Sequence, residues 1–157
     1  MIADDAPHLH GVDQISISGL TSDSRAVKPG FLFAALPGTS VDGAKFIPQA
    51  IASGAAAVLA QKGVTVEGVP HIEVDNPRLI FARMAARFFG SQPDLVVAVT
   101  GTNGKTSVAS FVREIWGNMG FRAASLGTIG VVSPSGTVGL QHTTPDPVRL
   151  HEIMAAL

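Results

Sequence analysis

One stretch decides the fold of this 157-residue chain: Val96-Val97-Ala98-Val99-Thr100-Gly101-Thr102-Asn103-Gly104-Lys105-Thr106-Ser107. An apolar run enters a loop that is bounded by glycines and ends in Gly-Lys-Thr, and helical periodicity follows it. This order is typical of a phosphate-binding loop, in which backbone N–H groups surround a polyphosphate at the positive end of a helix. We therefore predict that the chain binds a nucleotide.

Each position of this loop has an expected role. The backbone N–H groups of Thr102, Asn103 and Gly104 are expected to surround the phosphates. Lys105 would reach the outer phosphates as a point charge, and the Thr106 hydroxyl would hold a magnesium ion. The predicted nucleotide site consists of Gly101, Thr102, Asn103, Gly104, Lys105, Thr106 and Ser107, with Lys105 and Thr106 as catalytic residues and Thr106 as the metal ligand. The general pattern GxxxxGK(S/T) requires glycine where Val99 stands, so the loop matches a shorter variant, Gly-Thr-Asn-Gly-Lys-Thr.

The composition describes a packed chain. Hydrophobic residues make up 46% of it and charged residues 15%, which argues against disorder. A net charge of −1 lacks the basic excess of nucleic-acid binders, and no apolar stretch approaches the roughly 20 residues that span a bilayer. The acidic start, Met1 to Asp5, does not resemble a secretory signal, and cysteine is absent. We expect a cytoplasmic protein with neither nucleic acid nor membrane as a partner.

A polar cluster, Gly90 to Asp94, predicts a linker between two units, residues 1–90 and 91–157. Elements expected in the first unit are strands at Gln14–Ser18, Phe31–Leu36, Ala55–Ala60 and His71–Val74, a helix over Ala44–Ser53 capped by Asp42, and a helix from Pro77. Those expected in the second are strands at Leu95–Thr100 and near Arg122–Leu126, a helix from Lys105 to about Gly120, a glycine-rich stretch over Gly127–Gly139 and a helix from Asp146-Pro147. Strands that alternate with helices imply an α/β layer structure.

The second unit offers no carboxylate on a predicted strand. The carboxylates after Lys105 are Glu114, Asp146 and Glu152, and all three fall on predicted helices or caps. A phosphate-loop domain needs further parallel strands and a strand carboxylate for its metal site. We therefore expect this chain to be the front part of a longer enzyme.

Two other groups of residues have structural interpretations. Asp75 or Asn76 is expected to cap the helix that begins at Pro77. His8 and His10 form a potential metal-binding pair, but no third ligand lies near them in the sequence. We interpret them as part of a mobile tail.

Further motifs around the loop resemble those of the Mur ligase family. In the second unit these are Leu126-Gly127-Thr128-Ile129-Gly130 and His142-Thr143-Thr144-Pro145. In the first unit, Thr21-Ser22-Asp23-Ser24-Arg25, Pro29 to Gly38, Asp42-Gly43 and Ile47 to Ile51 resemble that family's uridine-nucleotide-binding domain. The resemblance runs from about Ile15 to Leu157 and is strongest to the branch that adds the third residue of the peptidoglycan stem peptide.

This resemblance implies an α/β fold in which a small N-terminal nucleotide-sugar-binding domain precedes the truncated start of a P-loop ATPase domain. It implies ATP and Mg2+ as cofactors, with UDP-MurNAc-L-Ala-D-Glu and an amino acid, diaminopimelate or lysine, as substrates. The substrate contacts that it implies are Ser22, Ser24, Thr39, Ser40, Val41, His142, Thr143 and Thr144. In such ligases ATP phosphorylates the terminal carboxylate of the dipeptide, and an amine then attacks the acyl phosphate. Because the family's carboxylated lysine and metal-binding glutamate would fall beyond residue 157, we expect this chain alone to be inactive.

Three alternatives stay open. The first is the family's ligase for the terminal dipeptide, which usually has an Asn-rich segment where this chain has Leu126-Gly127-Thr128 and lacks the Thr-Thr-Pro that follows. The second is another ligase of the superfamily, such as folylpolyglutamate synthetase, which lacks the first domain. The third is a non-catalytic fragment that binds a nucleotide sugar or nothing.

Overall fold

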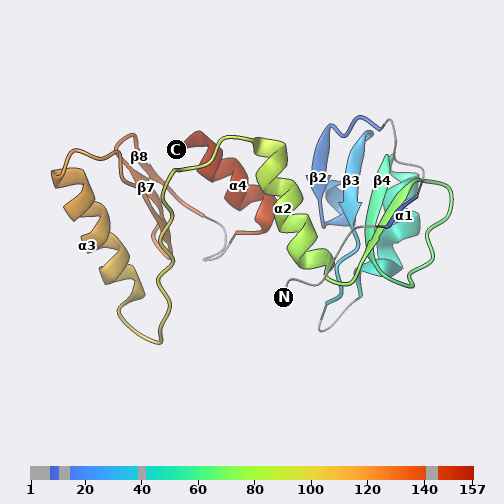
Figure 1. Ribbon diagram of the computed structural model, residues 1–157, viewed down its shortest axis with the longest axis horizontal. Helices are drawn as coiled ribbons and strands as arrows, with labels where there is room; N and C mark the ends of the chain where they lie inside the picture. Colours follow the sequence, from blue (N-terminus) through green and yellow to red (C-terminus); the bar gives the residue numbers. More distant parts are fainter. Residues whose placement is uncertain (1–7, 11–14, 39–41, 141–144) are drawn as a thin grey trace. The chain divides into compact units, whose positions relative to one another are not determined.

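The computed structural model describes residues 8–10, 15–38, 42–140 and 145–157. The chain forms two compact units, Met1–Arg87 and Phe88–Leu157. Both contain strands and helices (Figure 1). The predicted α/β class is therefore confirmed, and the two units are described separately below.

The first unit is built on a five-stranded sheet. Its strands are β1 (His8–His10), β2 (Gly19–Thr21), β3 (Phe31–Ala34), β4 (Ala57–Gln61) and β5 (His71–Val74), in the order β1-β5-β4-β3-β2. The strands β2 to β5 are parallel, and β1 adds to the edge as an antiparallel strand. Parallel neighbours need a crossover between them, and η2 (Gly43–Phe46) with α1 (Ile47–Ala52) supplies it between β3 and β4.

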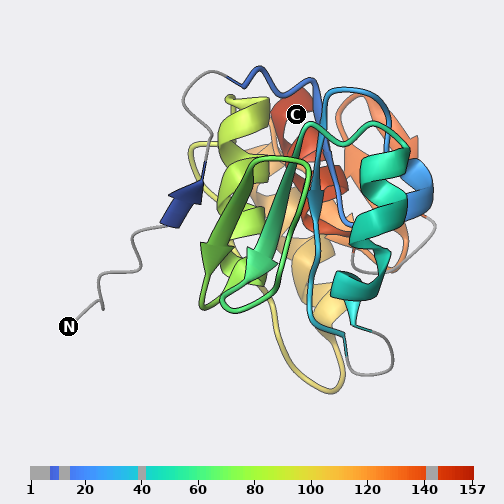
Figure 2. The same cartoon turned by 90° about the vertical axis from the view of Figure 1, so that its right-hand side faces the viewer.

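Both faces of this sheet are buried. On one face, Phe33 and Val58 pack in a cluster with Ile47 and Ala50 of α1. Because side chains alternate along a strand, Leu59 belongs to the opposite face, and it is buried as well. The helix α2 (Pro77–Phe89) buries Pro77, Phe81 and Ala85 at helical spacing. The helices α1 and α2 flank the strands (Figures 1 and 2), as expected for a parallel sheet.

Most first-unit elements lie close to their predicted positions, but two predictions were wrong. Residues 15–18 are irregular, and the first parallel strand begins at Gly19, where it pairs with Phe31 of β3. The histidines of β1, interpreted from the sequence as part of a tail, lie in a strand that pairs with β5. Both errors concern pairing between distant segments, which local patterns do not reveal.

The second unit contains two helices and a three-stranded meander. Its elements are α3 (Lys105–Asn118), β6 (Ser125–Gly127), β7 (Gly130–Ser133), β8 (Gly136–Val138) and α4 (Pro147–Ala156). The strands pair antiparallel in the order β6-β7-β8. The predicted helices are present, and Gly120 follows α3 with a φ of +88°, as expected for a helix stop.

In this unit one strand prediction was wrong and another was displaced along the chain. The segment Leu95–Thr100 is not a strand, and Leu95 is 63% exposed. A strand needs a hydrogen-bonded neighbour, and among the described residues none pairs with this segment. The strand expected at Arg122–Leu126 begins only at Ser125. The glycine-rich stretch after it contains β7 and β8, which the sequence analysis missed, although Pro134 and Gly136 are residues that favour a β-turn between two strands.

Among the described residues, no helix is both long enough and apolar enough to cross a membrane.

Gly43 gives a test of the packing at the start of the β3–β4 crossover. A Cβ at this position would lie 2.6 Å from the Leu36 carbonyl oxygen and 2.7 Å from the Leu36 nitrogen. Since both are backbone atoms, Gly43→Ala should lower the free energy of unfolding by about 1–3 kcal/mol. Urea unfolding followed by circular dichroism measures this change.

The matched control is Gly117→Ala in α3, where an added Cβ meets nothing within 4 Å. Alanine favours a helix over glycine, so this variant should be unchanged or stabilised by up to about 1 kcal/mol. Equal stability of the Gly43 variant and the wild-type chain would contradict the packing argument.

Candidate functional site

The phosphate loop ends in a helix whose first turn lacks a side-chain cap. Gly104 is the N-cap residue of α3 and has a φ of +76°, while Gly101 has a φ of +147°. Both values favour glycine. No side chain accepts from the first turn of α3 and no acidic residue lies in it, whereas Asp146 accepts from two N–H groups of α4. The first N–H groups of α3 are thus available to an anion.

Lys105 folds back onto this loop. Its Nζ donates to the carbonyl oxygen of Gly101 at 2.5 Å and to that of Thr102 at 3.4 Å. The loop is exposed throughout, as are Thr106 and Ser107 in the first turn. The ammonium group therefore lies at the same solvent-facing loop as the helix start, and both contribute positive charge there.

Ser24 lies in the turn after β2, in the short helix η1 (Ser24–Ala26), and is only 7% exposed. Its hydroxyl donates to Oε1 of Gln49 in α1 at 3.1 Å. A hydroxyl has one proton to donate and two lone pairs to accept with. Ser24 can therefore accept from a ligand as it stands, but it must leave Gln49 before it can donate to one. Ser22, the other serine of this turn, is exposed.

An ion pair stabilises this turn. The Asp23 carboxylate accepts from the backbone N–H and the Nε of Arg25, both at 2.9 Å, and from its Nη2 at 2.8 Å. The side-chain hydrogen bonds from Arg25 lower the pKa of Asp23, and the backbone bond adds to the effect. Sequence reasoning missed this pair and the role of Gln49, although aspartate is a recognisable capping residue at the start of a helical turn.

The remaining predicted substrate contacts, Thr39, Ser40, Val41, His142, Thr143 and Thr144, lie outside the described residues. A hydrogen bond from the Gly43 N–H to the Leu36 carbonyl joins the described backbone before position 39 to that after position 41. Arg78 donates to the carbonyl of Pro37, the residue that follows Leu36. Asn76 accepts from Leu79 N–H at 3.1 Å, which confirms the predicted cap of α2.

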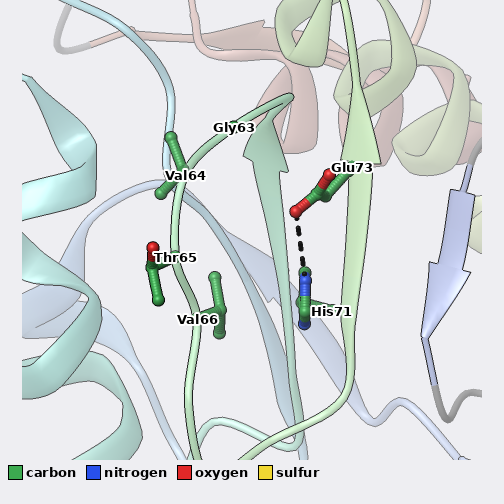
Figure 3. Close-up of a pocket in the computed structure, with 6 residues that line it drawn as sticks. All are labelled: Gly63, Val64, Thr65, Val66, His71 and Glu73. Atoms are coloured by element: carbon green, nitrogen blue, oxygen red, sulfur yellow. Dashed lines mark hydrogen bonds and ion pairs between the residues drawn. The ribbon is translucent and has the colours of Figure 1, made fainter.

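The pocket in Figure 3 contains none of the predicted site residues. It has a volume of about 320 Å³ and is lined by Gly63, Val64, Thr65, Val66, His71 and Glu73. His71 and Glu73 point toward each other there, with 3.3 Å between Nε2 and Oε1. The predicted nucleotide-binding residues, Gly101 to Ser107, lie instead in the exposed loop and the first turn of α3.

Sequence comparison assigns this architecture to a known class. The fold is α/β, and the glycine-bounded loop before α3 has the form of a phosphate-binding loop. A family model described as "Mur ligase family, catalytic domain" matches residues 16–89, and one described as "Mur ligase middle domain" matches residues 99–157. The chain belongs to the Mur ligase family.

Similar curated proteins share one name, UDP-N-acetylmuramoyl-L-alanyl-D-glutamate–2,6-diaminopimelate ligase. The Brucella melitensis protein is 53% identical over 92% of this chain, and the Bradyrhizobium diazoefficiens protein is 49% identical over 98%. The chain spans about a third of these relatives, 30% and 32% of their lengths.

Solved structures show the same relationship. A structure of a ligase with that name matches 89% of the chain with a TM-score of 0.69 and 28% identity. The MurF ligase of Thermotoga maritima, solved in complex with ADP, matches 68% of the chain with a TM-score of 0.52 and 29% identity.

The Asp23–Arg25 pair predicts a small dependence of stability on pH. The folded-state pKa of Asp23 lies below its ordinary value of 3.8. The ionised carboxylate therefore contributes stability above about pH 4, and this contribution is lost as the pH falls through the folded-state pKa. Because the Asp23 side chain is 46% exposed, the loss should stay below about 1 kcal/mol.

Asp23→Asn should reduce the stability difference between pH 7 and pH 3, measured by urea unfolding. Asp94→Asn, in an exposed irregular segment, is the matched control. An unchanged pH dependence in the Asp23 variant would contradict the assignment.

Proposed function

We propose that this chain is the N-terminal part of an ATP-dependent amide ligase that adds the third stem-peptide residue to UDP-MurNAc-L-Ala-D-Glu. The main support is a glycine-bounded loop that enters an uncapped helix, in a chain 53% identical to a ligase of this name. The names of the relatives specify 2,6-diaminopimelate, so we propose this amino acid over lysine.

The reaction needs an activated carboxylate, because a free carboxylate is a poor electrophile. A carboxylate oxygen of the dipeptide attacks the γ-phosphorus of ATP, the bond to ADP breaks, and an acyl phosphate forms. The amine of the amino acid then attacks the acyl carbon, phosphate leaves and an amide forms. The proton lost by the amine goes to a base or to water.

The loop would serve the first of these steps. The N–H groups at the start of α3 would bind phosphate oxygens, and Lys105 would offset the negative charge on the transferred phosphoryl group. For this Lys105 would leave the carbonyls of Gly101 and Thr102, since a phosphate is the stronger acceptor. The Thr106 hydroxyl, in the first turn of α3, suits Mg2+, which would neutralise phosphate charge when bound.

The first unit would bind the nucleotide sugar. Ser24, with Ser22 and Thr39 to Val41, would contact the uridine diphosphate part. His142, Thr143 and Thr144 of the second unit would contact the muramoyl peptide. In this role Ser24 would accept from a ribose hydroxyl or the uracil N–H as it stands, or leave Gln49 to donate to a diphosphate oxygen.

A MurF-type ligase is the second candidate. The MurF structure aligns over a smaller share of the chain and at a lower TM-score than the diaminopimelate ligase. The second unit's Leu126-Gly127-Thr128 also favours the first candidate.

Lys105→Ala should weaken ATP binding by about 1.5–3 kcal/mol, the free energy typical of a charge-assisted contact. Calorimetric titration with ATP and Mg2+ measures the change. Lys62→Ala is the matched control, because Lys62 is an exposed lysine of the first unit. Unchanged ATP affinity in the Lys105 variant would rule out the loop as the ATP site.

Ser24→Ala should cost about 1 kcal/mol of UDP affinity and leave ATP binding unchanged, because it removes one hydrogen-bonding group from the first unit only. Ser18→Ala is the control, since that hydroxyl is exposed and donates to the carbonyl of Pro29. Titration with UDP of the whole chain and of residues 1–90 tests both expectations. Absence of UDP binding to the wild-type chain would remove the nucleotide-sugar role from this unit.

A further inference from the structure

A single arginine links the helix after the phosphate loop to the strands of its own unit. The Nη1 of Arg113, in the third turn of α3, donates to the Oγ of Ser125 in β6 at 3.1 Å. Among the side-chain hydrogen bonds of the described residues, this is the one that connects α3 with another helix or strand. The backbones of α3 and β6 are also in contact. The Arg113–Ser125 bond therefore joins the helix to the meander.

Arg113 lies on the side of α3 that packs. The helix has no fully buried residue, and its apolar residues Phe111 and Ile115 are exposed. Ala109 and Trp116, about one turn before and after Arg113, are half-buried, and the Arg113 side chain is 20% exposed. A guanidinium group thus occupies the middle of the packed side. Among the described residues, apolar burial contributes little to fixing the direction of this helix.

A guanidinium group that is mostly removed from water needs hydrogen-bond acceptors. The Nη2 of Arg113 lies 3.4 Å from Oε1 of Glu114, but the Glu114 side chain is 61% exposed, so solvent screens this ion pair. Ser125 is held more firmly, because it lies opposite Val132 in the ladder of β6 and β7, and β7 also pairs with β8. The bond to Ser125 therefore attaches α3 to a three-stranded sheet.

The direction of α3 decides where its first N–H groups point. Arg113 follows Lys105 by eight positions, which corresponds to about 12 Å along the helix axis. A change of about 5° in the direction of the helix at Arg113 therefore moves its first turn by about 1 Å. Hydrogen bonds from N–H groups to oxygen require distances of about 2.7–3.2 Å, so such a shift is enough to weaken several of them.

We propose that Arg113 is a positioning residue for the phosphate loop. Through Ser125 it holds α3 in the direction in which the first N–H groups of the helix and Lys105 meet the phosphates of ATP. Arg113 itself lies two turns away from the loop and acts through the helix. This inference rests on the ATP-binding role proposed above and adds to it a residue outside the loop.

The experiment is a calorimetric titration of the 157-residue chain with ATP and Mg2+. Arg113→Ala and Ser125→Ala should each weaken ATP binding about three- to tenfold. The double variant should bind no more weakly than the weaker single variant, because both changes remove the same contact. Arg113→Lys should recover part of the affinity, since lysine retains a donor for Ser125.

A second measurement tests the positioning without ATP. The backbone amide NMR signals of Gly104 and Lys105 should shift in the Arg113→Ala chain and return toward their wild-type positions in the Arg113→Lys chain. A role in stability alone would lower the resistance to urea and leave both the ATP affinity and these signals unchanged.

Arg122→Ala is the matched control, because Arg122 is an exposed arginine between α3 and β6 and its loss removes the same charge from the same unit. This variant should bind ATP as the wild-type chain does. Urea unfolding verifies that each variant is folded, and Ser125→Ala decides the test should Arg113→Ala fail to fold. Equal ATP affinity in the wild-type chain and the folded variants would overturn this inference and leave the loop as the ATP site. Absence of ATP binding to the wild-type chain would remove the ATP site itself, and this inference with it.

Discussion

The first backbone N–H groups of a helix have no partner within the helix, and the second unit meets this constraint in two ways. In α4, the Asp146 carboxylate accepts from Val148 and Arg149. In α3, the preceding residue is glycine, no side chain caps the first turn, and the first residue, Lys105, is positively charged. The first arrangement satisfies the donors within the chain. The second leaves donors and positive charge at the surface, as an anion-binding site requires.

The parallel sheet of the first unit likewise determines where its polar turn lies. β3 and β4 are buried on both faces, so polar residues are confined to the turns at the strand ends. Ser24 follows β2 in such a turn and reaches Gln49, which α1 brings to it. The Asp23–Arg25 pair then fixes the turn locally. A buried hydroxyl at the end of a strand is thus a product of the fold and of two local interactions.

Elements that depend on local patterns were predicted from the sequence. Asp42, Asn76 and Asp146 each accept from a backbone N–H at the start of the helix that follows. Elements that depend on a distant partner were not. Leu95–Thr100 has the apolar composition of a strand but no neighbour in the described chain, and β1 has a neighbour that composition does not reveal. Composition indicates that a segment can pair, whereas pairing requires a second segment.

The candidate sites divide in the same way. The phosphate loop is one continuous segment, so its residues, their order and the helix that follows them can be predicted from the sequence alone. The Ser24–Gln49 contact joins residues 25 positions apart, and the β1–β5 ladder joins residues more than 60 apart. Sequence reasoning found Ser24 only through a family resemblance, and it assigned His8 and His10 to a tail because their neighbours lie elsewhere in the chain.

The helix α3 contains both an exposed apolar stripe and the uncapped N–H groups that follow the phosphate loop. Its apolar residues Val108, Phe111 and Ile115 recur at helical spacing and are 46–63% exposed. A helix with such a stripe is oriented by whatever surface buries it. The direction of the stripe and the direction of the first N–H groups are fixed to each other, because both belong to one rigid helix. Burial of the stripe would therefore also set the direction in which the first N–H groups of α3 point.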